Sequence, residues 1–260
     1  MNLPISNAHE LPCDSTTKTN TSTTQKSPNV ADQDLVSKDL NQLANPLGDK
    51  QAEIVASLLD RHVPFYVRLQ VSPFEAQAAK LLNELLRTNK PNWPLFHLFF
   101  CSSRLEAISG AIKIVRHNRL IHMPTGPVAT AVYDPSKHLV ELYDPLRKGI
   151  EQALIPGLMY LDNLTDTLAA ITKSKVSSVL ITNLNQIPVD ELQDLLSAAR
   201  TNDIYSILDE SSANVARDGF ACRSLAAPPD VIVLGENLTD HRAPSGGFMM
   251  SSKLYKVWNT

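Results

Sequence analysis

FFCSSRLEAISGAIK, residues Phe99–Lys113, joins an apolar strand to a helix with almost no loop between them. The strand is predicted over Leu95–Cys101 and the helix over about 104–117. Ser103 and Glu106 have the spacing of a capping box, in which a serine oxygen accepts from a helix amide and a glutamate reaches back. The stretch therefore predicts a strand that leads directly into a helix N-terminus.

Outward from this unit, short apolar strands alternate with helices along the chain. Such alternation favours an α/β fold, with a mainly parallel sheet covered by helices on both faces. Ligands bind these sheets beyond the carboxyl ends of the strands, so the segments after the strands are the candidate sites. Further strands are predicted at Val128–Tyr133, Val176–Thr182, Ile204–Asp209, Val231–Leu234 and Gly247–Met250, and further helices at Gln51–Asp60, from Ser72 onward, at Asp166–Lys173 and at Pro188–Arg200.

The composition is that of an ordinary globular protein, with 43% hydrophobic and 20% charged residues among 260. A net charge of -3 offers no basic face to a phosphate backbone, which argues against nucleic acid as a partner. No stretch reaches the roughly 20 apolar residues of a membrane-spanning helix, and no leader pattern is visible, so the cytoplasm is the expected compartment. The cysteines and histidines lack the spacing of a disulfide framework or a metal site, so no metal is expected.

The first part of the chain differs from the rest. Residues 1–34 are rich in Ser, Thr, Asn and Lys and poor in large apolar side chains. Such a segment cannot offset its ordering entropy by burial, so it is predicted to be a disordered tail. One folded domain is expected over residues 45–260.

Three segments located just after strands could carry chemistry. The first, at Ser103, reads equally well as a capped helix or as an anion site, because free amides and the helix dipole favour negative charge there. The second, Asp209-Glu210, places two carboxylates on opposite faces, so they are not expected to share a proton. The third, Gly235-Glu236, opens a loop without a nucleophile, since the later Ser245 has no identifiable base and no G-x-S-x-G motif is present.

Taken in order, these segments resemble the class III pyridoxal-phosphate aminotransferases of fold type I. The likeness runs from about Asn45 to Asn259 and implies the large domain of such an enzyme, whose dimer interface lies beside the active site. The matching stretches are Asn45–Gly48 for N-P-x-G, Phe99–Lys113 for F-x-N-S-G-T-E-A-x-E-A-A-I-K, Tyr205–Ser212 for the strand ending in D-E-x-Q, Pro229–Gly235 for P-D-I-V-x-x-G, and Gly246–Phe248 with Lys253–Trp258 for the region after the Schiff-base lysine.

The resemblance also assigns cofactor-binding roles, and these are only partly kept. Ser103 matches the family residue at the phosphate, and Asp209 matches the carboxylate that pairs with the pyridinium nitrogen. Arg104 and Leu105 replace the Gly-Thr pair that receives the phosphate. Ser211-Ser212 replaces residues that pack on the ring and bond its phenolic oxygen. The vestigial cofactor-binding set is therefore Ser103, Asp209 and Ser212.

The catalytic position departs further from the family. Glu236 stands where the family carries its lysine, so transamination by the usual route is not expected. Thr182 replaces a family glutamate. The chain ends at Thr260, before the family's C-terminal domain and before a threonine that reaches the neighbouring subunit's phosphate. Losing two phosphate contacts worth roughly 1.5–3 kcal/mol each weakens the cofactor by orders of magnitude, so bound pyridoxal phosphate is not expected.

This resemblance leaves three functional hypotheses open. The first is a non-catalytic pseudoenzyme that forms a homodimer, or a heterodimer with a full-length aminotransferase. The second is a truncated or decayed transaminase with no selected activity. The third is a repurposed enzyme in which a cleft carboxylate, Asp209, Glu210 or Glu236, acts as general base.

Overall fold

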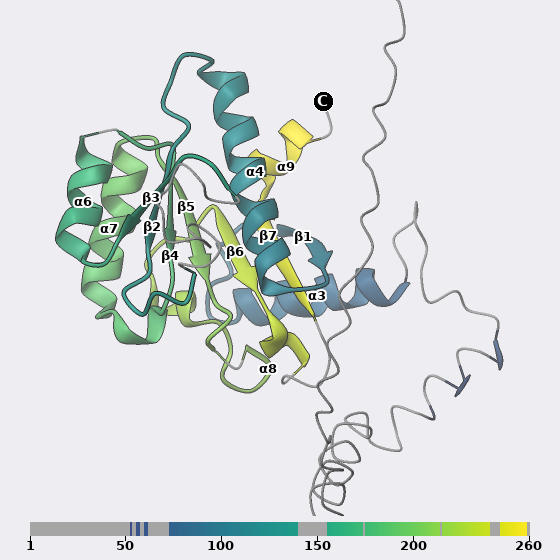
Figure 1. Ribbon diagram of the computed structural model, residues 1–260. Helices are drawn as coiled ribbons and strands as arrows, with labels where there is room; N and C mark the ends of the chain where they lie inside the picture. Colours follow the sequence, from purple (N-terminus) through teal and green to yellow (C-terminus); the bar gives the residue numbers. More distant parts are fainter. Residues whose placement is uncertain are drawn as a thin grey trace, which may run out of the picture. The chain divides into compact units, whose positions relative to one another are not determined.

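The computed structural model describes residues 73–139, 155–173, 175–213, 215–239 and 245–258, together with a few positions between 53 and 61 (Figure 1). All of these belong to one compact unit, Leu47–Thr260. The predicted tail at 1–34, the Asn45–Gly48 stretch and most of the predicted helix at 51–60 lie outside the described residues. Among the helices that the structure describes, none is long and apolar enough to cross a membrane.

A single seven-stranded sheet forms the centre of the described chain, in the order β1-β7-β6-β5-β4-β2-β3. β7 is antiparallel to both of its neighbours, and the pairs among β2 to β6 are all parallel. The predicted mainly parallel α/β sheet is therefore confirmed. The strands are β1 (Phe96–Cys101), β2 (Thr130–Tyr133), β3 (Leu158–Leu161), β4 (Ser178–Ile181), β5 (Tyr205–Asp209), β6 (Val231–Leu234) and β7 (Gly246–Ser251).

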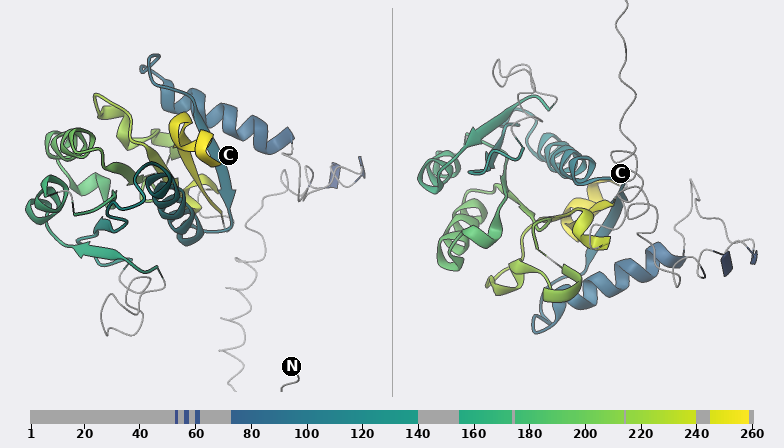
Figure 2. Two further views of the ribbon diagram at one scale, coloured as in Figure 1. Left: turned by 90° about the horizontal axis from the view of Figure 1, so that it is seen from above. Right: turned by 60° about the horizontal axis from the view of Figure 1, so that its bottom comes forward.

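Helices cover both faces of this sheet, as the alternation predicted (Figure 2). The cluster on one face contains α4 and α9 side chains, and the cluster on the other contains side chains of α3, α6, α7 and α8. The helices are α3 (Pro73–Arg87), α4 (Arg104–His122), α6 (Leu164–Thr172), α7 (Val189–Thr201), α8 (Val215–Asp218) and α9 (Ser252–Trp258), and the 3-10 turns are η2 (Leu184–Gln186), η3 (Ala221–Ser224) and η4 (Glu236–Thr239).

The strand residues divide between the two faces with a period of two, which is why the inner strands read as continuous apolar runs. In β6, Val231 and Val233 pack with α4, whereas Ile232 and Leu234 pack on the other side. Each of these four side chains is fully buried. A strand that is apolar on both faces is expected only where helices cover both.

β1 is an edge strand that a buried asparagine ties to α3. The Asn83 side chain accepts from the Phe96 amide at 2.8 Å and donates to the Phe96 carbonyl at 2.9 Å. These two bonds satisfy backbone groups at the start of β1 that have little other access to partners. They fix where β1 begins, and therefore the positions of Ser102 and Ser103, which follow its other end.

Two features of the fold were not predicted from the sequence. β3, Leu158–Leu161, is a four-residue edge strand in which only Leu158 is buried, so its apolar signal is weak. α4 continues to His122, beyond the predicted end near His117, because Asn118 and Arg119 are buried and form hydrogen bonds with Tyr205 and Asp203. The tertiary contact extends the helix further than the local pattern indicates.

Candidate functional site

The three segments singled out from the sequence meet at the end of the sheet where the parallel strands have their carboxyl ends. β1, β5 and β6 run in the same direction, so Ser103, Asp209 and Gly235 all lie at carboxyl ends. A Cβ built on Gly235 would lie 3.1 Å from Arg104 Cβ and 3.0 Å from Ser211 Cβ. The structure thus brings the three segments close together, and Gly235 is the residue that allows them to approach so closely.

Asp209 is the carboxylate at the centre of this site, and it is 1% exposed. Its Oδ2 accepts from Arg104 Nε at 3.0 Å and from Arg104 Nη2 at 2.5 Å. Its Oδ1 accepts from the Ser211 amide at 3.0 Å. Both oxygens are therefore engaged within the chain, and the charge is compensated by a guanidinium whose side chain is 22% exposed.

Glu210 turns to the opposite face of β5 and serves a structural role. Its carboxylate accepts from the Ala221 amide at 2.9 Å and from the Cys222 amide at 2.7 Å, which anchors η3. Burial raises the pKa of Glu210, and the two backbone donors act against that shift. The expectation that Asp209 and Glu210 would not form a catalytic dyad agrees with these separate partners.

A buried asparagine that the sequence did not single out joins the loops after β5 and β6. Asn237 Oδ1 accepts from the Gly235 amide at 2.9 Å, and Asn237 Nδ2 donates to the carbonyls of Glu210 at 2.9 Å and Ala213 at 2.6 Å. The residue is 3% exposed. It fixes the position of the loop that carries Glu236, which lies half-buried at the first position of η4.

Ser103 caps α4, and Arg104 is the first residue of that helix. The Ser103 hydroxyl accepts from the Glu106 amide at 3.3 Å, and the Glu106 carboxylate accepts from the Ser102 amide at 2.8 Å. The reach-back bond therefore ends one residue earlier than the capping box predicts. Arg104 places a cation at the helix end where the dipole favours an anion, and its pairing with Asp209 compensates that unfavourable position.

The remaining residues assigned by resemblance are not among the hydrogen-bond partners described for Asp209. Ser212 is exposed and lines a separate hollow of about 400 Å³ with Phe220 and Ala221. Leu105 is 44% exposed on the surface of α4. Thr182 is buried and donates to the Tyr133 carbonyl at 3.0 Å, which joins β4 to β2.

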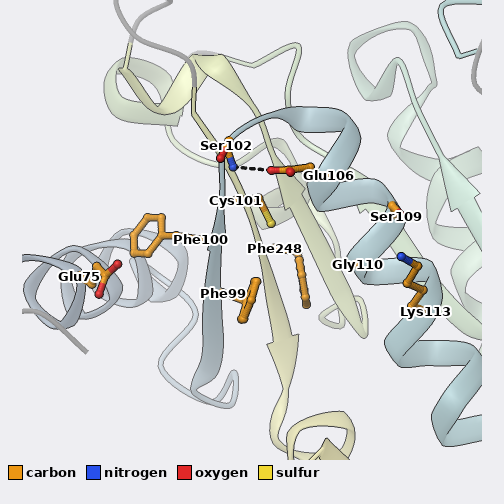
Figure 3. Close-up of a pocket in the computed structure, with 10 residues that line it drawn as sticks. All are labelled: Glu75, Phe99, Phe100, Cys101, Ser102, Glu106, Ser109, Gly110, Lys113 and Phe248. Atoms are coloured by element: carbon orange, nitrogen blue, oxygen red, sulfur yellow. Dashed lines mark hydrogen bonds between the residues drawn. The ribbon is translucent and has the colours of Figure 1, made fainter. Parts of the chain in front are cut away.

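A groove of about 490 Å³, the α4 groove, lies next to this site between β1, α3 and α4 (Figure 3). Phe99 and Phe248 lie side by side on neighbouring strands, with ring centroids 5.5 Å apart, and Phe99 is 46% exposed. A Cβ on Gly110 of α4 would lie 2.6 Å from the Phe248 ring, so glycine allows helix and ring to touch. The groove is lined by Glu75, Phe99, Phe100, Cys101, Ser102, Glu106, Ser109, Gly110, Lys113 and Phe248.

Pyridoxal phosphate, the cofactor that the resemblance implies, can be tested against these contacts. Its ring nitrogen requires the Asp209 carboxylate, whose oxygens already accept from Arg104 and Ser211. Its phosphate requires an uncrowded, anion-binding start of α4, where Arg104 now extends across the site. In this arrangement the residues do not fit the cofactor.

Comparison with known proteins gives the same fold. No protein-family model matches the chain. The acetylornithine aminotransferase of Methanothermobacter thermautotrophicus is 28% identical over 206 residues, which are 73% of this chain and 46% of that protein. The chain thus spans about half the length of the curated relative that it matches.

Solved structures agree with this relationship. The N-acetylornithine aminotransferase of Stenotrophomonas maltophilia superposes with a TM-score of 0.60 and 20% identity, over 79% of this chain and 54% of that one. A Bacillus anthracis aminotransferase gives a TM-score of 0.65 with 14% identity, over 80% and 53% of the two chains. The ornithine aminotransferase of Toxoplasma gondii gives 0.62 with 15% identity, over 78% and 52%. The chain therefore has the fold of the class III aminotransferases, of whose length it spans about half.

Proposed function

We propose that this chain is a non-catalytic relative of the class III aminotransferases that acts by pairing with another subunit of the same fold. The observation that carries the proposal is the carboxylate at position 236. Glu236 comes directly after Gly235 at the end of β6, the strand next to the one that ends in Asp209, which is where the family resemblance puts the lysine. A carboxylate cannot condense with an aldehyde, so the chemistry on which transamination depends has no nucleophile at this position.

A repurposed enzyme that uses the cleft carboxylates is less well supported. Asp209 is held by Arg104 and by the Ser211 amide, and Glu210 is held by two amides of η3. A general base must reach a substrate proton, and Asp209 and Glu210 are 1% and 0% exposed. The contacts leave Glu236 as the one candidate among these three.

An unselected remnant is the other alternative. Loss of selection is expected to introduce polar or misfitting side chains into the core. The two apolar clusters on either face of the sheet are instead continuous over the described strands. The buried carboxylates Asp209 and Glu210 also have hydrogen-bond donors. These features support a maintained folded protein.

The catalytic part of the proposal predicts no site-specific reaction with pyridoxal phosphate. The protein is incubated with the cofactor and reduced with borohydride, and adducts are mapped by peptide mass spectrometry. We expect only weak, non-saturable labelling of surface lysines such as Lys253, which lies by Tyr205 at the opposite edge of the sheet. Glu236→Lys is expected to give no measurable turnover, because Arg104 still holds Asp209.

A full-length class III aminotransferase, treated in parallel, serves as the positive control and should label stoichiometrically at its lysine. Stoichiometric, saturable labelling of one cleft lysine in this chain, with an absorbance band that amino acids discharge, would overturn the non-catalytic assignment.

The α4 groove supports the pairing part of the proposal. Exposed Phe99 and half-buried Phe100 line this groove together, and an aromatic patch of this kind is a surface that partner proteins cover. Along α4, Glu106 and Lys113 lie at equal distances from the point between Ser109 and Gly110. If two copies of α4 cross antiparallel there, each Glu106 faces the Lys113 of the other copy, as an isologous interface requires. The partner that this surface fits is therefore a second copy of the chain.

The pairing predicts that purified protein has twice the 28.6 kDa mass of one chain by light scattering. Phe99→Asp should weaken the dimer at least about 30-fold, because it removes a central aromatic contact worth about 2 kcal/mol. The matched control is Val189→Asp, since Val189 is 47% exposed on α7 and outside the groove. A monomeric wild type, or equal effects of both variants, would contradict the assignment of this surface.

A further inference from the structure

Arg104 places a positive charge beside Asp209, where a cofactor complex would have the positively charged ring nitrogen of pyridoxal phosphate. Asp209 ends β5 and Arg104 begins α4, and they are 105 residues apart in sequence. The Arg104 stem passes Gly235, where a Cβ would come within 3.1 Å. A buried carboxylate with no counter-charge is costly, and the guanidinium provides that charge with two donors to one oxygen.

We infer that Arg104 is a built-in substitute for the cofactor cation at Asp209, and that it both stabilises the fold without pyridoxal phosphate and excludes that molecule from the site. The inference rests on the proposed non-catalytic function for the identity of the site. It goes further in assigning a role to Arg104. Arg104 donates twice to one oxygen of this carboxylate and compensates its charge, so a guanidinium already takes the place of a ring nitrogen at that oxygen.

The stabilising role is tested by a double-mutant cycle on the full chain. Asp209→Asn and Arg104→Ala each break the buried pair and should lower the melting temperature by about 10 °C. The double variant should lower the melting temperature by clearly less than the sum of the two single losses. Each single variant leaves one charge of the pair without its partner, whereas the double variant removes both charges. Additive losses would overturn the inference.

Two further variants keep the test decisive. Arg104→Lys retains the charge but loses the forked geometry of the guanidinium. It should therefore lower the melting temperature by less than Arg104→Ala does, even if the alanine variant folds poorly. Lys80→Ala is the control, because Lys80 and Glu84 form an exposed pair at 3.8 Å that should contribute almost nothing. An Arg104→Lys loss equal to that of Lys80→Ala would also count against the inference.

The excluding role is tested by thermal shift with pyridoxal phosphate. Arg104→Gly combined with Leu105→Thr restores the pair of residues that the family has at this position. We expect the cofactor at millimolar concentration to raise the melting temperature of this variant by several degrees and to leave the wild type unchanged. An equal response in the two proteins, including no response in either, would show that Arg104 is not what excludes the cofactor.

The two tests separate this inference from the proposed function. Labelling of one cleft lysine would refute the non-catalytic function without bearing on the coupling between Arg104 and Asp209. Additive melting-temperature losses would refute the role of Arg104 while leaving Glu236, and the absence of a nucleophile there, unaffected.

Discussion

Replacing Asn237 by alanine is expected to lower the free energy of unfolding by about 3 kcal/mol. The change removes three hydrogen bonds and leaves the Gly235 amide and the carbonyls of Glu210 and Ala213 without this partner in a buried region. Each buried polar group left unsatisfied costs roughly 1–3 kcal/mol, although local rearrangement recovers part of that loss. Urea denaturation monitored by circular dichroism measures the difference.

The matched control for this change is Asn185→Ala. Asn185 is an exposed asparagine in η2, in a loop after a different strand, and its replacement should alter stability by less than about 0.5 kcal/mol. A loss below about 1 kcal/mol for Asn237→Ala would mean that the loops after β5 and β6 do not depend on this side chain.

Gly246→Ala is expected to destabilise the protein by about 3 kcal/mol, the upper end of the usual cost of overpacking. A Cβ at this position would lie 2.2 Å from the Ser103 carbonyl oxygen and 2.4 Å from its carbon. These are backbone atoms of the turn between β1 and α4, so they cannot move away by a change of rotamer. Relief of the clash requires the start of α4 to shift away from β7, which also moves Arg104 from Asp209.

Gly126→Ala is the control for this second change. A Cβ there would lie 3.2 Å from Met123 Cβ, a close contact that a small shift relieves, so we expect a loss of about 1 kcal/mol or less. Thermal and urea unfolding of both variants give the comparison. Equal, small losses would show that the turn before α4 accommodates a methyl group.

The inner strands were predictable from the sequence because each is buried on both faces and appears as an apolar run. The direction of β7 could not be predicted, because an apolar run such as Gly247–Met250 is equally compatible with a parallel and an antiparallel strand. The register of β7 depends instead on Gly246 and Gly247, which lie against the backbone of Ser103 and Phe99. Such contacts exist only after residues far apart in sequence have been brought together.

The candidate site was predicted in outline but not in its contacts. The rule that ligand sites lie at carboxyl ends identified Ser103, Asp209 and Gly235. The ion pair between Arg104 and Asp209 could not be predicted from the residues, because helix-initial arginines normally extend into solvent. Asn237 was missed for a similar reason, since an asparagine two residues after a glycine reads as turn chemistry. Only the buried geometry shows that its amide joins two loops.

The antiparallel strand β7 has a consequence for how the chain folds. Among the described strands, β1 pairs with β7 alone, and the hydrogen bond between His97 and Ser252 spans 155 residues. Closing a loop of that length costs roughly 4 kcal/mol in chain entropy before any contact repays it. β6 and β7 are close in sequence and can pair first, whereas β1 must wait for them. During synthesis on the ribosome, β1 therefore lacks its strand partner until residue 251 has emerged, and we expect the pairing of β1 with β7 to be the last and slowest step in forming the sheet.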